Sequence, residues 1–104
     1  MKDPESMKSV RNQLDQVDRE LRDLFQRRMD LVDQVAEIKR SSNIAITDEA
    51  REREIVETAL AAARPELAGE VGTFVCTLLS LSKFRQRKLL FDLAEDPLLP
   101  PPAE

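Results

Sequence analysis

The chain is short, highly charged and acidic overall. It has 104 residues, of which 41% are hydrophobic and 35% charged, and its formal net charge at pH 7 is -4. This predicts one small domain with a thin core, and the mixture of acids and bases argues against nucleic acid as a partner. The chain has no histidine and one cysteine, Cys76. These counts exclude Ser-His-Asp and Cys-His catalysis, the usual transition-metal sites and an internal disulfide.

The first predicted element is a long helix from about Pro4 or Ser6 to about Ser41. Its apolar seam, spaced by threes and fours, consists of Val10, Leu14, Val17, Leu21, Leu24, Leu31, Val35 and Ile38. Arg28 takes a leucine's place in this seam, and its permanent charge must be met by an anion from the fold or from a ligand if the seam is buried. The helix would span about 50 Å, too long to be covered within one small globule, so we expect a partner chain.

A second helix is predicted after the turn SSNIAIT. Thr47 or Asp48 can cap its start, and Pro65 marks its end. One stripe of this helix is apolar and consists of Ile55, Val56, Ala59, Leu60 and Ala63.

A third helix is predicted from near Pro65 or Glu66 to about Leu93, with an irregular first turn because Gly69 and Gly72 weaken it. Its apolar positions are Val71, Phe74, Val75, Leu78, Leu81, Leu89 and Leu90, and Cys76 is expected in or near the core.

The overall prediction is an all-α domain over residues 1–95, with one long, one short and one medium-long helix, followed by a Pro-rich, disordered tail over 96–104. No apolar run approaches the about 18 residues of a membrane span, and the N-terminus lacks a signal-peptide apolar region. We therefore expect a soluble, cytoplasmic protein without a membrane partner.

Each predicted helix carries polar residues on its inward stripe. They are Arg28 and Lys39 on the first helix, Glu52 on the second, and Ser82 and Gln86 on the third. Asp48 and Arg51 lie beside Glu52 in the first turns of the second helix. Taken singly, each is also compatible with an ordinary role as a snorkelling cation, a helix cap, a surface ion pair or a packing polar group. Their recurrence on all three helices favours a small, carboxylate-rich ligand bound inside a helical bundle.

Arg11 extends this interpretation to a second chain. It lies in a heptad row with Phe25, Val32 and Lys39, but 17 residues separate it from Arg28. That separation is roughly 25 Å of helix, too far for both arginines to hold one small molecule within one chain. If Arg11 serves the site, it comes from a second, antiparallel chain.

The spacing of these residues resembles that of the bacterial all-helical chorismate mutases, most closely the mutase domain fused to prephenate dehydratase in enteric bacteria. The resemblance rests on VRNQLDQVDRELRDLFQRRMDLVDQVAEIK followed by ITDEAREREI, which needs no gap, and on LSLSKFRQ after a shorter connection. It spans about residues 7 to 90.

The resemblance implies an intertwined antiparallel homodimer of three-helix chains, acting as an isomerase of the shikimate pathway in aromatic amino acid biosynthesis. The implied reaction is the [3,3] rearrangement of chorismate to prephenate, which requires no nucleophile, metal or cofactor. Catalysis would come from selecting the compact conformer of chorismate and from stabilising negative charge on its ether oxygen.

The resemblance also implies roles for the residues around the ether bond. Lys39 and Gln86 would donate hydrogen bonds to the ether oxygen. Arg28, with Arg11 of the partner chain, would clamp the two substrate carboxylates.

The remaining implied roles concern the ring and one carboxylate. Glu52 and the backbone at Asp48 would hold the ring hydroxyl, and Val35 would pack against the ring. Arg51 and Ser82 would assist at the carboxylate end.

Three alternatives stay open at this point. An aminodeoxychorismate mutase would accept an amine in place of the ring hydroxyl, while an isochorismate pyruvate lyase of the same fold lacks the Asp-x-x-Arg-Glu arrangement found here. A non-catalytic helical dimerisation or regulatory module would use its seam charges to set register. Lys83 and Arg85 also make the third-helix motif more basic than that of the family, and could alter the site entrance.

Overall fold

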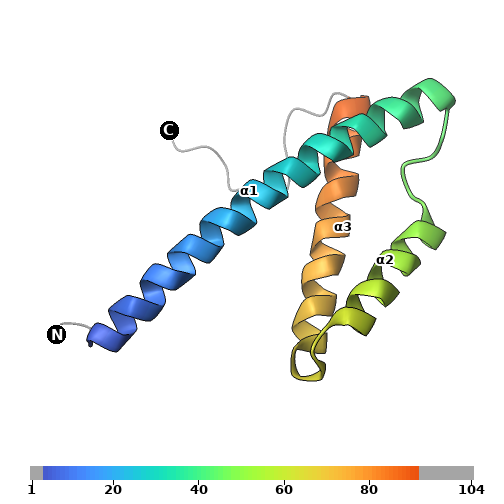
Figure 1. Ribbon diagram of the computed structural model, residues 1–104. Helices are drawn as coiled ribbons and strands as arrows, with labels where there is room; N and C mark the ends of the chain where they lie inside the picture. The colour runs from blue at the N-terminus through green and yellow to red at the C-terminus, as the bar shows by residue number, and fades with distance from the viewer. Residues whose placement is uncertain (1–3, 92–104) are drawn as a thin grey trace. The chain divides into compact units, whose positions relative to one another are not determined.

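The computed structural model describes residues 4–91, and this part of the chain contains helices and no strand. Figure 1 shows α1 (Glu5–Ser42), α2 (Glu49–Ala62), the short 3-10 turn η1 (Pro65–Leu67) and α3 (Ala68–Phe91). The all-α prediction and the order of long, short and medium-long helices are confirmed. The expected domain boundary at residue 95, the end of the third helix near Leu93 and the tail over 96–104 lie outside the described residues.

Helix α1 ends because Asn43 turns the backbone into the left-handed region, with φ of 55°. Asparagine tolerates this conformation better than most residues. Two hydrogen bonds close the end, from Ile44 N to the Lys39 carbonyl at 2.9 Å and from Asn43 N to the Arg40 carbonyl at 3.4 Å. This Schellman arrangement satisfies carbonyls that a helix end would otherwise leave open, and it directs the chain into the loop before α2.

The start of α2 is set by Asp48, one of the two caps expected from the sequence. Its Oδ1 accepts a hydrogen bond from Arg51 N at 3.0 Å, and its φ and ψ of -124° and 91° are those of an N-cap. Pro65 begins η1, where its missing N–H leaves no bond unmade. The irregular first turn predicted for the third helix is thus a 3-10 turn.

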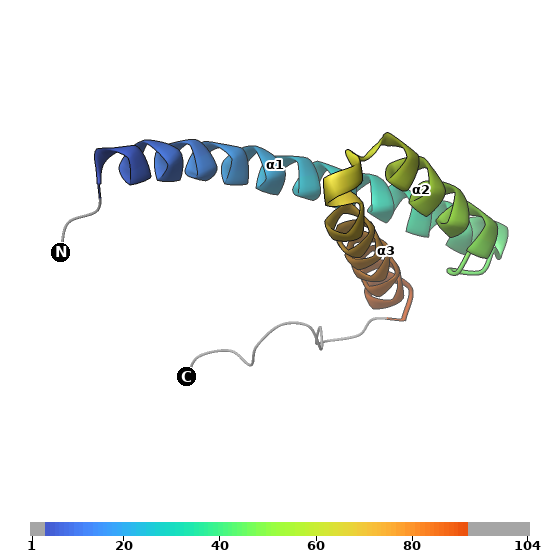
Figure 2. The ribbon, with the colours of Figure 1, turned by 90° about the horizontal axis from the view of Figure 1, so that it is seen from below.

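Helices α2 and α3 form a hairpin joined through η1, as the views in Figures 1 and 2 show. The two helices approach each other at Gly72, where a Cβ atom would lie 3.4 Å from Cδ2 of Leu60, close to an ordinary van der Waals contact. The described chain divides into two compact units between Leu31 and Val32, although α1 runs unbroken through the division. The second unit contains the last turns of α1 together with the hairpin.

The core of the second unit is small. Its buried hydrophobic side chains are Val32 and Ala36 of α1 and Val75 of α3, and two polar side chains of α3, Ser82 and Gln86, are buried with them. No residue of α2 is buried. Phe74 and Leu89, expected at apolar positions of the third helix, are 52% and 41% exposed. The inward placement of Ser82 and Gln86 agrees with their stripe in the sequence.

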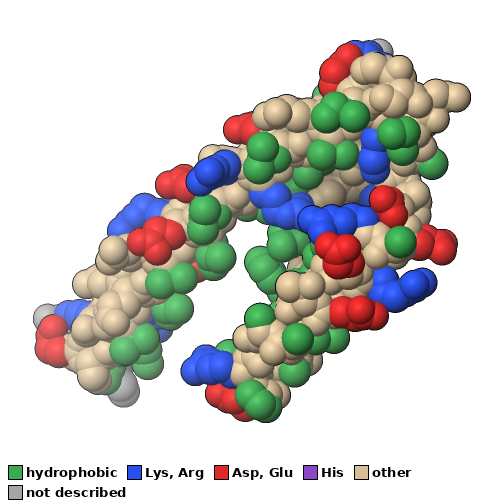
Figure 3. Space-filling model, turned by 45° about the vertical axis from the view of Figure 1, so that its right-hand side comes forward, with side chains coloured by type: hydrophobic (Ala, Val, Ile, Leu, Met, Phe, Trp, Pro, Cys, Tyr) green, Lys and Arg blue, Asp and Glu red, His purple; other side chains and the backbone are tan. Residues whose placement is uncertain are grey.

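The seam predicted along α1 is left uncovered by the chain. In the first unit every large apolar seam residue from Val10 to Leu31 is between 48% and 60% exposed. Figure 3 shows hydrophobic side chains repeated along this half of α1. Val35 and Ile38, farther along the same helix, are 41% and 60% exposed. Soluble proteins rarely leave such a continuous apolar face open to water.

One segment has the length and composition of a membrane span. Among the described residues this is Pro65–Phe91, with a mean hydropathy of 1.2 in its most apolar window. The expectation that no apolar run reaches this length is therefore wrong for this segment. The segment matches a membrane span in length and composition only. Core helices of soluble proteins can have the same length and composition.

Candidate active site

The most informative polar pair lies on α3. Ser82 and Gln86 are only 6% and 5% exposed. Ser82 Oγ donates to the Leu78 carbonyl at 2.7 Å, and Gln86 Nε2 donates to the Ser82 carbonyl at 3.3 Å. Gln86 Oε1 is buried and finds no hydrogen-bond partner among residues 4–91. An unpaired buried polar atom costs about 1–3 kcal/mol, so this amide marks a place where the single chain leaves a polar site incomplete.

Lys39 is held by the loop that follows its helix. Its Nζ donates to the Ile46 carbonyl, and its own carbonyl accepts from Ile44 N. The side chain is partly buried. An ammonium group has three protons, so two remain for another acceptor after the bond to Ile46. The loop therefore fixes a cation that can still donate.

The three polar residues at the start of α2 have separate environments. The Asp48 side chain serves as the N-cap. Arg51 pairs with Glu54 at 2.6 Å, and both side chains are at least 60% exposed, so the structure does not bring Arg51 into the buried polar cluster. Glu52 instead pairs with Lys83 of α3 at 2.9 Å. The α2–α3 hairpin thus places Glu52 next to the helix that carries Ser82 and Gln86.

A second inter-helix ion pair joins α1 to α3 within the same unit. Arg85 donates from Nε to Asp33 Oδ1 at 2.7 Å and from a terminal guanidinium nitrogen to Oδ2 at 2.9 Å. Since Arg85 precedes Gln86 directly, this two-point contact fixes the turn of α3 that carries the buried amide relative to the last turns of α1. Sequence reasoning noticed Arg85 but missed Asp33, because the two residues are 52 positions apart and no local pattern joins them.

The same pair lowers the pKa of Asp33. The hydrogen bonds from Arg85 favour the charged carboxylate most strongly, burial opposes them, and the positive charge of Arg85 acts in the same direction as the hydrogen bonds. Because the folded-state pKa is below the unfolded value of about 4, the pair stabilises the fold above that pH. The stabilisation is lost as the pH falls through the lowered pKa.

We therefore predict that Asp33→Asn lowers the free energy of unfolding by about 1 kcal/mol at pH 7, a modest value because both side chains remain about one third exposed. The difference from wild type should vanish at a pH below the lowered pKa of Asp33. Urea unfolding at equal protein concentration at the two pH values measures it. Glu37→Gln, which removes the exposed partner of Arg40, is the matched control and should change little. An undiminished difference at acid pH would contradict the assignment.

Arg11, Arg28 and Val35 all lie on α1. Arg11 and Arg28 both belong to the first unit. They lie on one unbroken helix, as the sequence predicted. Val35 belongs to the second unit. The shared role of the two arginines across chains stays a prediction.

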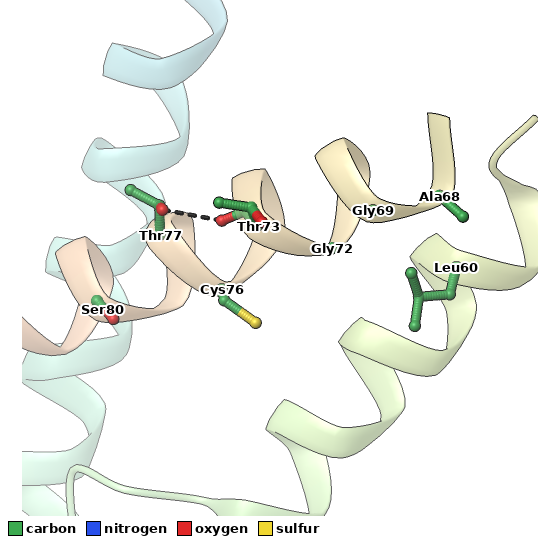
Figure 4. Close-up of a pocket in the computed structure, with 8 residues that line it drawn as sticks. All are labelled: Leu60, Ala68, Gly69, Gly72, Thr73, Cys76, Thr77 and Ser80. Atoms are coloured by element: carbon green, nitrogen blue, oxygen red, sulfur yellow. Dashed lines mark hydrogen bonds between the residues drawn. The ribbon is translucent and has the colours of Figure 1, made fainter. Parts of the chain in front are cut away.

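One hollow of the structure is lined by none of these polar residues. It has a volume of about 710 Å³ and is lined by Leu60 and by small residues of α3, including Gly72, Cys76 and Ser80 (Figure 4). Cys76 is exposed there, so its expected place in or near the core is wrong for the single chain. The lining includes neither Lys nor Arg, so the hollow does not suit a dicarboxylate.

A smaller hollow, of about 450 Å³, is lined by Lys39, the loop over 43–47 and Arg87. It includes one predicted site residue and has a cationic lining. Among residues 4–91 no cluster of carboxylates and thiols gathers that could hold a metal ion.

Comparison with known families identifies one family. The family model described as chorismate mutase type II matches residues 10–87, a range that contains every predicted site residue from Arg11 to Gln86. No curated protein and no solved structure gives a significant match.

Proposed function

Because the chain belongs to the chorismate mutase type II family and is therefore a chorismate mutase, we propose that it converts chorismate to prephenate at the site around Lys39, Glu52 and Gln86. The observation that carries this placement is the buried Gln86 amide, whose Nε2 has a second proton to donate, on the α3 face that also buries Ser82. The family match supplies the reaction, and the buried amide supports its location.

The reaction breaks one C–O bond and forms one C–C bond in a single step, without proton transfer. The chain must therefore hold the compact conformer of the substrate and stabilise the charge that develops on the ether oxygen. Lys39 has two protons beyond its bond to Ile46, and Gln86 Nε2 has a second proton beyond its bond to Ser82. We assign these protons to the ether oxygen.

The substrate carboxylates are assigned to Arg28 and to Arg11 of a second copy of the chain. Ser82 would join them by turning its hydroxyl away from the Leu78 carbonyl, and Arg51 would join them by leaving Glu54. At the ring, Glu52 would accept a hydrogen bond from the hydroxyl, and the backbone at Asp48 would help to hold the same group. Val35 would pack against the ring carbons.

The second copy is supported by the open seam of α1. An antiparallel homodimer would cover the apolar seam residues from Val10 to Ile38, each of which a single chain leaves at least 41% exposed. The same dimer would bring Arg11 of one chain to the site of the other. We further place the protein in the cytoplasm, in aromatic amino acid biosynthesis, and assign it no cofactor.

The proposed reaction is tested by incubating purified protein with chorismate and following the loss of chorismate absorbance. We expect turnover, and unchanged chorismate would refute the proposal. A thermal-shift measurement with a bicyclic dicarboxylate that mimics the transition state gives a second readout. A tight ligand of the folded protein must raise its melting temperature. At a ligand concentration a hundred times Kd, the free energy of unfolding rises by about 2.7 kcal/mol.

A further inference from the structure

We propose that Lys83 sets the substrate preference of the site, favouring a ring hydroxyl over a ring ammonium group, by keeping a positive charge beside Glu52. This inference rests on the proposed function, because it takes Glu52 as the residue that meets the ring substituent. It addresses the choice between chorismate and its amino analogue, which the identity of Glu52 alone leaves open, since a carboxylate accepts from either group.

The contact between Lys83 and Glu52 is less exposed than five other ion pairs of the structure. The Lys83 Nζ and Glu52 Oε1 atoms are 2.9 Å apart, and the two side chains are only 28% and 23% exposed. The Arg85–Asp33 side chains are 37% and 35% exposed, and those of the remaining pairs are at least 50% exposed. Water and salt therefore screen the Lys83–Glu52 pair less than these five.

The position of Lys83 connects it with the site rather than with the outer surface. It follows the buried Ser82 directly and precedes the buried Gln86 by three residues. Its partner Glu52 comes from the other helix of the hairpin. The pair thus joins α2 and α3 where both helices present residues assigned to the substrate.

The effect on a neutral substituent is small. A carboxylate has two oxygens with room for several hydrogen bonds. Lys83 occupies Oε1 of Glu52, so the other oxygen can accept from a hydroxyl. The hydroxyl has no net charge and is not repelled by the nearby ammonium group.

An ammonium substituent would meet a different environment. An aliphatic amine is protonated at neutral pH. Two donors that bind the two oxygens of one carboxylate lie about 5 Å apart, so an ammonium group bound to Glu52 would lie at about that distance from the Lys83 ammonium group. Repulsion between like charges at that distance, reduced by the remaining solvent exposure, is enough for a discrimination of about tenfold. Without Lys83, the Glu52 carboxylate would attract the ammonium group.

The test compares kcat/KM for chorismate and for the analogue with an amine in place of the ring hydroxyl. Lys83→Met removes the charge, Lys83→Gln removes the charge but keeps a donor for Glu52, and Lys83→Arg keeps the charge. We expect the ratio of amine to hydroxyl substrate to rise about tenfold in Lys83→Met and Lys83→Gln, and to stay near the wild-type value in Lys83→Arg. Lys83→Gln keeps the test decisive if Lys83→Met does not fold.

Lys88→Met is the matched control. It removes the same charge from the same helix, five positions along and therefore about 140° around it, and should leave the ratio unchanged. Equal loss for both substrates in the two uncharged Lys83 variants would show a purely structural role and overturn the proposal. An equal rise in Lys88→Met would overturn it as well. If wild type converts neither substrate, the proposed function itself fails, which is a distinct result.

Discussion

Replacing Lys39 by alanine is expected to lower kcat/KM for chorismate by about 10²–10³-fold, the usual effect of removing one donor to a developing oxyanion. The loss should appear in kcat, because the charge on the ether oxygen exists in the transition state and not in bound chorismate. Lys39 is suited to this role because the Ile46 carbonyl holds its ammonium group in place while leaving two protons for the substrate. Steady-state kinetics with chorismate measures the effect.

The control for Lys39 is the next residue along α1. Arg40→Ala removes an exposed cation that pairs with Glu37, and it should leave kcat within about twofold of wild type, as expected for a surface ion pair. Circular dichroism and gel filtration of both variants establish that they fold and associate like wild type. A folded Lys39→Ala variant with wild-type kcat would remove Lys39 from the catalytic set.

The second large effect is the recovery of activity when two inactive variants are mixed. Arg11→Ala and Arg28→Ala should each be nearly inactive, because each lacks one cation for the substrate carboxylates at both sites of the dimer. After subunit exchange in an equal mixture, half of the dimers are mixed, and each mixed dimer has one site with both arginines. Activity should therefore rise to about a quarter of the wild-type value.

The control mixture combines Arg11→Ala with the double variant Arg11→Ala/Arg28→Ala. No pairing of these chains builds an intact site, so activity should stay at its low starting value. Exchange is verified by mixing differently tagged chains and isolating the dimer that carries both tags. Absence of recovery in the first mixture after verified exchange would show that Arg11 does not act across the interface.

Much of the fold follows from short-range signals in the sequence. Asp48 caps α2, and the apolar period gave the extent of α1, because these features depend on residues within one or two turns. The burial of Ser82 and Gln86 was also predictable, since their spacing of four puts both on the stripe that continues from Val75. Local periodicity thus located the buried half of the candidate site.

The contacts that the sequence did not predict have a common cause. The apolar pattern of a helix shows which residues share a face, but it does not show which other helix that face contacts. Asp33 meets Arg85, and Glu52 meets Lys83, only because three helices pack together, and neither pair is a neighbour in sequence. Arg51 had a local alternative, Glu54 at three positions along α2, and the isolated chain adopts it. Cys76 was misplaced because residues of α3 on both sides of it are small or apolar, so the pattern does not tell a core face from an open one.

The narrow core has a consequence for how the enzyme responds to dilution. Only three hydrophobic side chains are buried among the described residues, while the long seam of α1 stays open. If a second copy covers that seam, most of the apolar burial that stabilises the fold is shared between chains, and folding and association become one equilibrium. A substitution in the seam, such as one at Leu21 far from any reacting atom, would then raise the protein concentration that the enzyme needs to be folded and active. Its defect would be severe in dilute solution and would disappear when the chain is abundant.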